Sequence, residues 1–262
     1  MKRIGIVGFG VMGEAFAAGL SARMPGVALS AFDVRRDHLE AACRKHSVTP
    51  ARSAAEVFAS SDISILCIKP QDLPAFCADV KGAARGRRVV SILAGRRIQA
   101  ISDGLGTDQV ARFMPNVAAT RGASLVGVAL HPAATPEMRS DSLAVAGALG
   151  SAMEIPEKLM AAMTGISGSG IAWVFQFAHA MALGGVASGF DYGTALSIAA
   201  STLESAVAMM KDGTHPLELA SRVISPAGTT IQGIRALEQG GFTAAVMAAV
   251  EAATRKAAEM EG

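Results

Sequence analysis

Three glycines near the start of the chain constrain its fold more than any other feature. Gly8, Gly10 and Gly13 form a G-x-G-x-x-G pattern, which follows an apolar run at residues 3–7 and precedes a helical apolar pattern at residues 14–24. In such a turn the first glycine allows a tight bend, the second lets a pyrophosphate approach the backbone, and the third lets helix and strand pack closely. In this context the pattern predicts a dinucleotide-binding turn, with the helix N-terminus facing the phosphates.

The rest of the first half alternates between strand and helix patterns. Apolar runs at residues 27–33, 63–68, 89–93 and 109–114 predict further strands, and residues 38–44 and 54–60 predict helices. Strands that are apolar throughout are typical of a parallel sheet covered by helices on both faces. Repeated βαβ units with right-handed crossovers therefore predict a doubly wound, Rossmann-like α/β domain.

The residues after the second predicted strand leave the choice of cofactor open. Asp33 stands 20 residues after Gly13, where a carboxylate would bond the ribose 2′-hydroxyl of NADH. Arg35 and Arg36 follow it and could hold the 2′-phosphate of NADPH, although a solvated helix start explains them equally well. We expect NADPH or NADH, with NADPH slightly favoured.

From about Met160 the pattern is helical only. Residues 171–187 are apolar almost all round, so this helix should be buried on every side, partly by another subunit. Further helices are predicted at residues 194–211, from Pro216 with Thr214 as its cap, and at residues 242–257.

The change of pattern sets the expected domain organisation. Residues 1–155 should form the dinucleotide-binding domain, and residues 156–262 a helical domain for substrate binding and dimerisation. A half rich in Ala, Gly and Met that cannot enclose its own apolar faces suggests a homo-oligomer.

Composition narrows the classes of partner and compartment. The 262 residues include 24 Lys or Arg and 22 Asp or Glu, a near-neutral balance that argues against nucleic acid. No uninterrupted apolar run reaches the roughly 18–20 residues of a membrane span, and Glu14 argues against a signal peptide. Cys43, Cys67 and Cys77 lack C-x-x-C spacing and predict reduced thiols. We expect a soluble cytoplasmic protein without a metal, a membrane or nucleic acid as partner.

Two glycine–serine loops predict the kind of substrate. Residues 164–170 and residues 225–230 each precede a predicted helix and gather amides and hydroxyls at its N-terminus. Such a place favours a carboxylate, although ordinary helix capping by Ser and Thr is the alternative for either loop alone. Two such loops in a dinucleotide-binding chain predict a small anionic substrate.

Six segments in order resemble the pyrroline-5-carboxylate reductases along essentially the whole chain. They are residues 6–13, 68–71, 91–95, 112–116, 164–170 with Ala172, and 225–230 with Gly233, Leu237 and Glu238. The resemblance implies a Rossmann domain followed by an all-α dimerisation domain, in dimers that assemble further, often to decamers. It also implies reduction of 1-pyrroline-5-carboxylate to L-proline with NADPH or NADH, a step of proline biosynthesis.

The resemblance also implies roles for individual residues. The expected cofactor-binding residues are Gly8, Phe9, Gly10, Val11, Met12, Gly13, Asp33 and Arg35, with Ile68, Lys69, Pro70, Ala94 and Gly95 along the nicotinamide end. Lys69 has an alternative interpretation as a solvated loop lysine. The substrate carboxylate should lie on Ser225 and on the amides of Gly228, Thr229 and Thr230. Thr230 should bond the ring nitrogen, so Thr230 and Ser225 are the catalytic candidates.

The chemistry agrees with this assignment. Hydride transfer to a C=N bond needs the carbon about 3–3.5 Å from the nicotinamide, so positioning dominates. A hydroxyl suffices to orient the nitrogen and relay a proton, and no metal or strong base is needed. We therefore interpret the scattered histidines as structural or surface residues, namely His38, His46, His131, His179 and His215.

Several positions depart from the family pattern and keep alternatives open. They are Ile171 for a usual Pro, Trp173 for Tyr, Ile224 for Ser or Thr, Ala227 for Gly, and Ala54 for Asn. One alternative is a paralogue that reduces a different cyclic imine carboxylate, and another is a non-catalytic NAD(P)-binding protein. A β-hydroxyacid dehydrogenase is disfavoured because Val174 stands where those enzymes carry a catalytic lysine.

Overall fold

The computed structural model describes residues 1–80 and 82–261. The chain divides into two compact units. The first comprises Met1–Gly168 together with the residues from Ala252 on, and the second comprises Ser169–Glu251. The predicted boundary near residue 155, between a dinucleotide-binding domain and a helical domain, stays a prediction.

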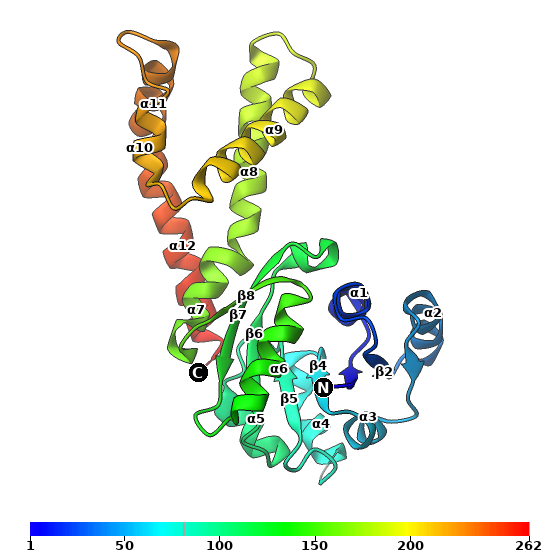
Figure 1. Cartoon of the computed structure of the whole chain (residues 1–262). Helices are drawn as coiled ribbons and strands as arrows, with labels where there is room; N and C mark the ends of the chain where they lie inside the picture. The colour runs from blue at the N-terminus through cyan, green and yellow to red at the C-terminus, as the bar shows by residue number, and fades with distance from the viewer. Residues whose placement is uncertain (81, 262) are drawn as a thin grey trace. The chain divides into compact units, whose positions relative to one another are not determined.

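The first unit is built on one eight-stranded sheet with the order β3-β2-β1-β4-β5-β6-β7-β8 (Figure 1). The strands are β1 (Arg3–Val7), β2 (Ala28–Phe32), β3 (Thr49–Pro50), β4 (Ile63–Leu66), β5 (Arg88–Ser91), β6 (Val110–Met114), β7 (Ser124–Leu130) and β8 (Gly150–Glu154). The five predicted strands are confirmed, whereas β3, β7 and β8 were not predicted. Neighbours are parallel except β6 and β7, so the five predicted strands form the expected parallel sheet.

The strand order reverses beside β1, and this position sets where a ligand can bind. The chain leaves β1 for β2 on one side and returns to β4 on the other, with Ile6 opposite both Ala31 and Ile65. In open α/β sheets, the crevice at the carboxyl ends of the strands beside such a reversal is the ligand site. The glycine turn after β1 and the segment after β4 both lie at this edge.

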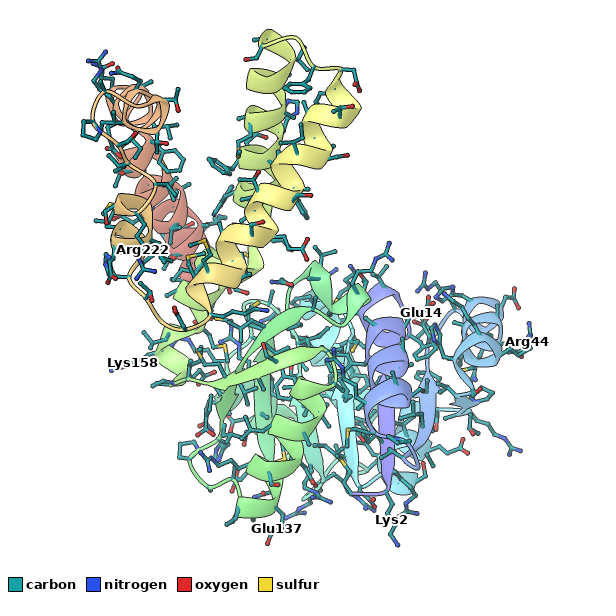
Figure 2. All side chains as sticks on the ribbon, turned by 45° about the horizontal axis from the view of Figure 1, so that its top comes forward. Lys2, Glu14, Arg44, Glu137, Lys158 and Arg222 are labelled. Atoms are coloured by element: carbon teal, nitrogen blue, oxygen red, sulfur yellow. The ribbon has the colours of Figure 1, made fainter. Side chains whose placement is uncertain are left out.

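Helices cover both faces of the sheet, as a doubly wound fold requires. One apolar cluster includes Phe16 of α1 (Val11–Arg23), Leu39 of α2 (Arg36–His46) and Met138 of α6 (Pro136–Gly147). The other includes Phe58 of α3 (Ala54–Ser60) and Ile101 of α5 (Ile98–Leu105), with α4 (Leu73–Asp79) beside them. Figure 2 shows charged side chains such as Lys2, Arg44 and Glu137 pointing outward from this unit.

The regular elements of the second unit, Ser169–Glu251, are all helices. The unit holds α8 (Gly170–Ala187), α9 (Tyr192–Met210), α10 (Pro216–Ser221), α11 (Thr229–Gln239) and the first part of α12 (Phe242–Glu259). A Cβ on Gly185 of α8 would lie 2.8 Å from the Cβ of Ala195 in α9, so small residues let these two helices approach closely. The helices predicted in this half of the chain are confirmed as α8, α9, α10 and α12.

Within the single chain only Gly170 and Ala182 of α8 are buried, so the expected burial of this helix on every side, partly by another subunit, stays a prediction. One local expectation for this unit is wrong. The cap of α10 is His215, whose side chain accepts from the amide of Leu217, and not Thr214.

One helical run is apolar enough to cross a membrane by length and composition alone. It spans Glu157–Ala187, and 11% of its apolar window is buried inside the chain. The sequence analysis looked for an uninterrupted apolar run and missed this segment, because Gln176 and His179 interrupt it. A helix that packs in a protein core passes the same test, so this single run is weak support for a membrane span.

Asp62 holds the start of the N-terminal strand through hydrogen bonds, and its pKa leads to a prediction about stability. Its carboxylate accepts from the amides of Lys2 at 2.7 Å and Arg3 at 3.0 Å and from the Arg3 guanidinium at 3.2 Å. The Lys2 amide first, and then the Arg3 groups, lower the pKa of Asp62 from 3.8 to about 2. A lowered pKa means that this contribution is present above the ordinary pKa and lost as the pH falls through about 2.

We expect Asp62→Asn to lower the free energy of unfolding at pH 7 by about 1 kcal/mol, because a neutral amide replaces an ion bonded at the partly exposed surface. Thermal or urea unfolding of wild type and variant from pH 7 to pH 2.5 measures the difference, with exposed Asp79→Asn as the matched control. The difference should shrink towards the acid end. A difference that is constant over this range contradicts the assignment.

Candidate active site

The three glycines of the first turn each have a distinct steric reason. Gly8 has a φ of +89°, and a Cβ there would lie 2.6 Å from the carbonyl oxygen of Cys67. A Cβ on Gly13 would lie 2.3 Å from the carbonyl oxygen of Gly8, so α1 packs directly on the turn. A Cβ on Gly10 would meet Nη2 of Arg35 first, at 3.7 Å. The first and third glycines are required by backbone contacts, and the second leaves its face open.

The N-terminus of α1 is suited to an anion. The helix begins at Val11, and Gly10 is its N-cap residue, which has no side chain to cap the first amides. The amides of Val11, Met12 and Gly13 therefore lack an intrahelical acceptor and lie at the positive end of the helix dipole. A phosphate group fits these donors and the open face of Gly10.

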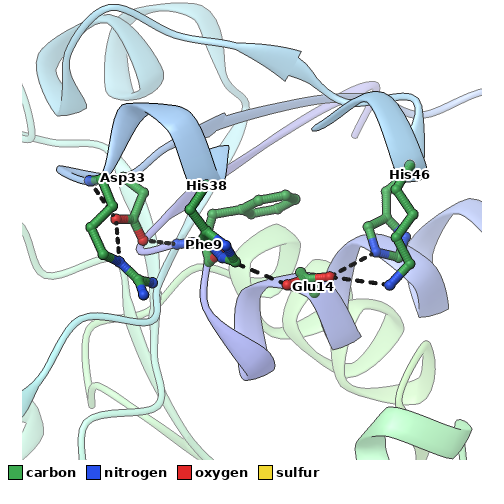
Figure 3. A network of polar contacts seen from close by, with 7 residues as sticks. Phe9, Glu14, Asp33, His38 and His46 are labelled. Atoms are coloured by element: carbon green, nitrogen blue, oxygen red, sulfur yellow. Dashed lines mark hydrogen bonds and ion pairs between the residues drawn. The ribbon is translucent and has the colours of Figure 1, made fainter. Parts of the chain in front are cut away.

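Asp33 is committed to bonds within the chain (Figure 3). Its Oδ2 accepts from the amide of Phe9 at 2.8 Å, and its Oδ1 accepts from the amide and Nε of Arg35 at 2.9 and 3.3 Å. The residue is 7% exposed. Burial raises the pKa of its carboxyl, but the hydrogen bonds from Arg35 and Phe9 outweigh burial and hold the pKa below its ordinary value. Asp33 thus fixes the glycine turn and orients Arg35.

The two adjacent arginines have different surroundings. Arg36 donates to the carbonyls of Ala51 and Arg52, and its guanidinium lies 5.1 Å from the centre of the Phe32 ring. Arg35 uses its Nε on Asp33 while its side chain is 62% exposed, with Nη2 near Gly10. Arg35 is therefore the arginine that the fold presents at the glycine turn.

A second polar cluster holds α2 against the same turn (Figure 3). His38 Nε2 lies 2.8 Å from the carbonyl oxygen of Phe9, to which it donates. Glu14 on α1 lies 3.3 Å from His46 Nε2 and 3.4 Å from Lys45 Nζ. Burial raises the pKa of Glu14, and the bonds to His46 and Lys45 reverse this and lower it. Both backbone polar groups of Phe9 are thus occupied inside the chain.

The segments after β4 and β5 are joined at their ends. Arg96 Nε donates to the carbonyl of Pro70 at 3.0 Å, and the amide of Ile92 donates to the carbonyl of Leu66 at 3.2 Å. The first bond joins the two segments predicted along the nicotinamide. One segment contains Ile68, Lys69 and Pro70, and the other contains Ala94 and Gly95, next to Arg96. Ile68 and Pro70 are half-buried, and Lys69 is exposed as the N-cap of η1 (Pro70–Asp72).

The first glycine–serine loop differs from its prediction. Residues 164–168 form a wide helical turn, η4 (Thr164–Gly168), between α7 (Met160–Met163) and α8, so no free helix N-terminus lies there. Asn116, to which sequence reasoning gave no role, donates from Nδ2 to the carbonyl and Oγ of Ser167 at 3.3 and 3.2 Å. Its place in the 112–116 motif was the available signal. Wide helical turns of this kind are frequent at functional sites.

The second glycine–serine loop has the predicted form and lies in the second unit. Helix α11 begins at Thr229 with Gly228 as its N-cap, and the amide of Gly228 donates to the carbonyl of Ser225 at 3.0 Å. A Cβ on Gly228 would lie 2.3 Å from Ser225 Oγ, so this hydroxyl sits over the start of the helix. Ala227 has a φ of +60°, which explains why glycine is usual there. Ser225 and Thr229 are exposed and Thr230 is half-buried.

The chemistry available here is that of binding and orientation. Over residues 1–80 and 82–261, no group of three or more His, Cys, Asp or Glu side chains is arranged to hold a metal ion. Asp33 and His38 bond to Phe9 within the chain, so the groups that the two turns leave for a ligand are amides, hydroxyls and the guanidinium of Arg35. The roles of the individual residues stay predictions.

Comparison with known proteins supplies the family. Residues 157–260 match the family model for pyrroline-5-carboxylate reductase dimerisation, and residues 3–95 match the model described as NADP oxidoreductase coenzyme F420-dependent. The chain is 39% identical to a pyrroline-5-carboxylate reductase of Methanosarcina acetivorans, over 99% of this chain and 98% of the relative. It is 36% identical to that of Synechocystis, over 98% of both chains.

A solved structure agrees with these matches in fold. The pyrroline-5-carboxylate reductase of Coxiella burnetii superposes with a TM-score of 0.93 at 23% identity, covering 100% of this chain and 99% of that one. At this low identity the solved structure shows the fold alone, and the relatives in sequence show the family. The Rossmann-like first part is followed by an all-helical dimerisation domain. The chain belongs to the pyrroline-5-carboxylate reductase family.

Proposed function

We propose that the chain reduces 1-pyrroline-5-carboxylate to L-proline with NADPH as the preferred hydride donor. The observation that carries the proposal is the pair of uncapped helix N-termini, each behind a glycine-containing turn, at Gly10 and at Gly228. One is suited to a pyrophosphate and the other to a carboxylate. A family member with these two anion sites has what the reductase reaction requires.

The residues of the first unit fit a nicotinamide dinucleotide, which supplies the hydride when bound. We infer that the amides of Gly10, Val11 and Met12 hold the pyrophosphate, whereas Phe9 supports the turn through its bonds to Asp33 and His38. Gly8 and Gly13 allow this backbone to form. The residues from Ile68 to Pro70, with Ala94 and Gly95, then border the nicotinamide end.

The preference for NADPH follows from the use of Asp33 inside the chain. An acidic residue that favours NADH must offer an oxygen to the ribose 2′-hydroxyl. Both oxygens of Asp33 already accept bonds from within the chain, the residue is only 7% exposed, and its bonds direct Arg35 towards Gly10. A guanidinium there is suited to a 2′-phosphate, because charge-assisted bonds to phosphate are among the stronger polar interactions.

The residues of the second unit fit a cyclic imine carboxylate. We infer that Ser225 Oγ and the amides of Thr229 and Thr230 bind the carboxylate, with the Gly228 amide shared with the carbonyl of Ser225. Thr230 Oγ1 then bonds the ring nitrogen and keeps its proton in place. A protonated C=N bond accepts hydride more readily than a neutral one, so holding that proton is the catalytic contribution of Thr230.

The family match to a dimerisation domain supports a homo-oligomer. Helix α8 leaves Phe175 and Leu183 exposed, and α12 leaves Met247 exposed, in a single chain. We infer that a second copy covers these faces in a dimer, and that dimers assemble further. Such an assembly buries the apolar run Glu157–Ala187 within protein, which supports a cytoplasmic enzyme rather than a membrane protein.

The activity is tested by steady-state kinetics of the purified chain with NADPH and NADH. We expect turnover of 1-pyrroline-5-carboxylate, and a higher kcat/KM with NADPH than with NADH. Piperideine-2-carboxylate, the six-membered homologue, is the comparison substrate. Turnover of that compound alone would assign a different cyclic imine, and cofactor binding with no turnover of either would assign a non-catalytic protein.

Arg35→Gln tests the cofactor preference. We expect kcat/KM for NADPH to fall roughly 10- to 100-fold, because a charge-assisted bond to the 2′-phosphate is lost. The value for NADH should change by less than about threefold. Arg44→Gln, an exposed arginine on α2 that points away from the unit (Figure 2), is the matched control. An equal fall in kcat/KM with both cofactors would show that Arg35 does not bind the 2′-phosphate.

Thr230→Val and Thr230→Ser form a matched pair for the substrate hydroxyl. Valine keeps the shape of the side chain without the hydroxyl, so we expect kcat for the imine to fall roughly 10- to 100-fold. Serine keeps the hydroxyl and should retain most of the activity, and the KM for NADPH should not change in either. Equal activity of the valine and serine variants contradicts a role for this hydroxyl.

A further inference from the structure

Arg112 is the largest fully buried side chain of the described residues, and it stands on β6 at the end of the sheet near the cofactor loops. It is 1% exposed. Its Nη2 donates to Oε1 of Glu261 at 2.5 Å, and its Nη1 lies 3.5 Å from Oε1 of Glu157. Removing one partner of a buried pair leaves an uncompensated charge, so the guanidinium depends on these two carboxylates.

Both carboxylates also contact the turn between β5 and α5. Glu157 Oε1 accepts from the amide of Ile98 at 2.6 Å, at the first residue of α5. Glu261 Oε2 lies 3.8 Å from Nε of Arg97, the N-cap residue of the same helix. The turn that contains Ala94 and Gly95 is thus followed directly by a helix start that is fixed from two sides.

Met260 contacts the turn itself. Gly95 has a φ of +68°, and a Cβ there would lie 2.6 Å from the carbonyl oxygen and 3.0 Å from the Cβ of Met260. The backbone of residue 260 therefore packs on the backbone of residue 95. The neighbouring Arg96 donates to the carbonyl of Pro70, so a shift of this turn would also move the segment after β4.

We propose that Glu261 is a positioning residue for hydride transfer. Bound to Arg112, it seats Met260 on Gly95 and holds the Ala94–Gly95 turn in the place from which it borders the nicotinamide. The inference rests on the proposed function, which assigns that turn to the nicotinamide end. Glu261 itself touches neither substrate nor cofactor in this scheme.

The energetics of the ion pair favour positioning over stability as its role. A buried pair seldom stabilises a protein more than apolar side chains of the same volume, because desolvation of both charges offsets their attraction. What the pair supplies is a fixed geometry, since a guanidinium with a short bond to one carboxylate tolerates few arrangements. Hydride transfer is sensitive to such geometry, because a displacement of about 1 Å can cost a factor of about 100 in rate.

The test compares Glu261→Gln with Glu259→Gln. Glu259 is an exposed residue of α12 that pairs with Lys256, so its variant controls for loss of one charge at the same end of the helix. Hydrogen–deuterium exchange of residues 92–99 in the cofactor-free protein reports on the turn. Steady-state kinetics with NADPH, and with NADPH deuterated at the transferred position, report on the reaction.

We expect E261Q to speed exchange in residues 92–99 and to lower kcat about tenfold at 25 °C, with the KM for the imine nearly unchanged. The deuterium isotope effect should rise, because a misplaced nicotinamide slows the hydride step itself. E259Q should match wild type in all three measurements. A variant E261Q that loses thermal stability but keeps wild-type kcat and isotope effect would overturn the proposal, as would exchange equal to that of E259Q.

A third variant keeps the proposal testable if E261Q does not fold. Glu261→Asp retains the charge beside Arg112 but shortens the side chain by one methylene, so the turn should shift while the buried charge stays paired. We expect a kcat between that of E261Q and wild type, and unchanged kcat in E261D would overturn the proposal. Failure of wild type to reduce the imine is a distinct result, which would reject the proposed function before any variant is compared.

Discussion

The contact of backbone on backbone at the first glycine turn is the constraint on which the first unit depends. Helix α1 lies so close to the end of β1 that Gly13 meets the carbonyl of Gly8, and Gly8 meets the carbonyl of Cys67 after β4. These two contacts join β1, α1 and β4 where the strand order reverses. Because the side chains are absent, the helix N-terminus is exposed to a ligand and not shielded from it. Asp33 and His38 then secure the turn through Phe9.

Sequence patterns predicted the five strands at the centre of the sheet and missed the three at its two ends. Strands β1, β4 and β6 are buried almost throughout and read as apolar runs. β8 is half exposed and contains Ser151 and Glu154, β3 has only two residues, and Gly127 interrupts β7 because Met163 packs against its Cα. The helices of the second unit were predicted from periodicity, whereas the exposure of α8 depends on contacts that one chain does not contain.

The sequence predicted the parts of the candidate site that depend on local backbone geometry. It did not predict which side chains form hydrogen bonds with each other. The glycine positions and the start of α11 follow from local spacing. Asp33 shows the limit, since the sequence offers a carboxylate to the ribose while the fold gives that carboxylate to Phe9 and Arg35. Asn116 and Ser167 are 51 residues apart, and Arg112 and Glu261 are 149 apart, so no local pattern could pair them.

The acids and bases at the first turn are bonded within the chain, and this matches the demands of the proposed reaction. Delivery of a hydride to an already protonated C=N bond needs placement and charge complementarity, and both can come from amides, a hydroxyl and helix dipoles. Ala227 fits this view, because a non-glycine residue in the left-handed region costs roughly 1–2 kcal/mol and persists only where surrounding structure enforces it. The strained residue lies between Ser225 and Gly228, in the turn that places the Ser225 hydroxyl at the start of α11. In the proposed function, this turn is where the Ser225 hydroxyl and the amides of α11 meet the substrate carboxylate.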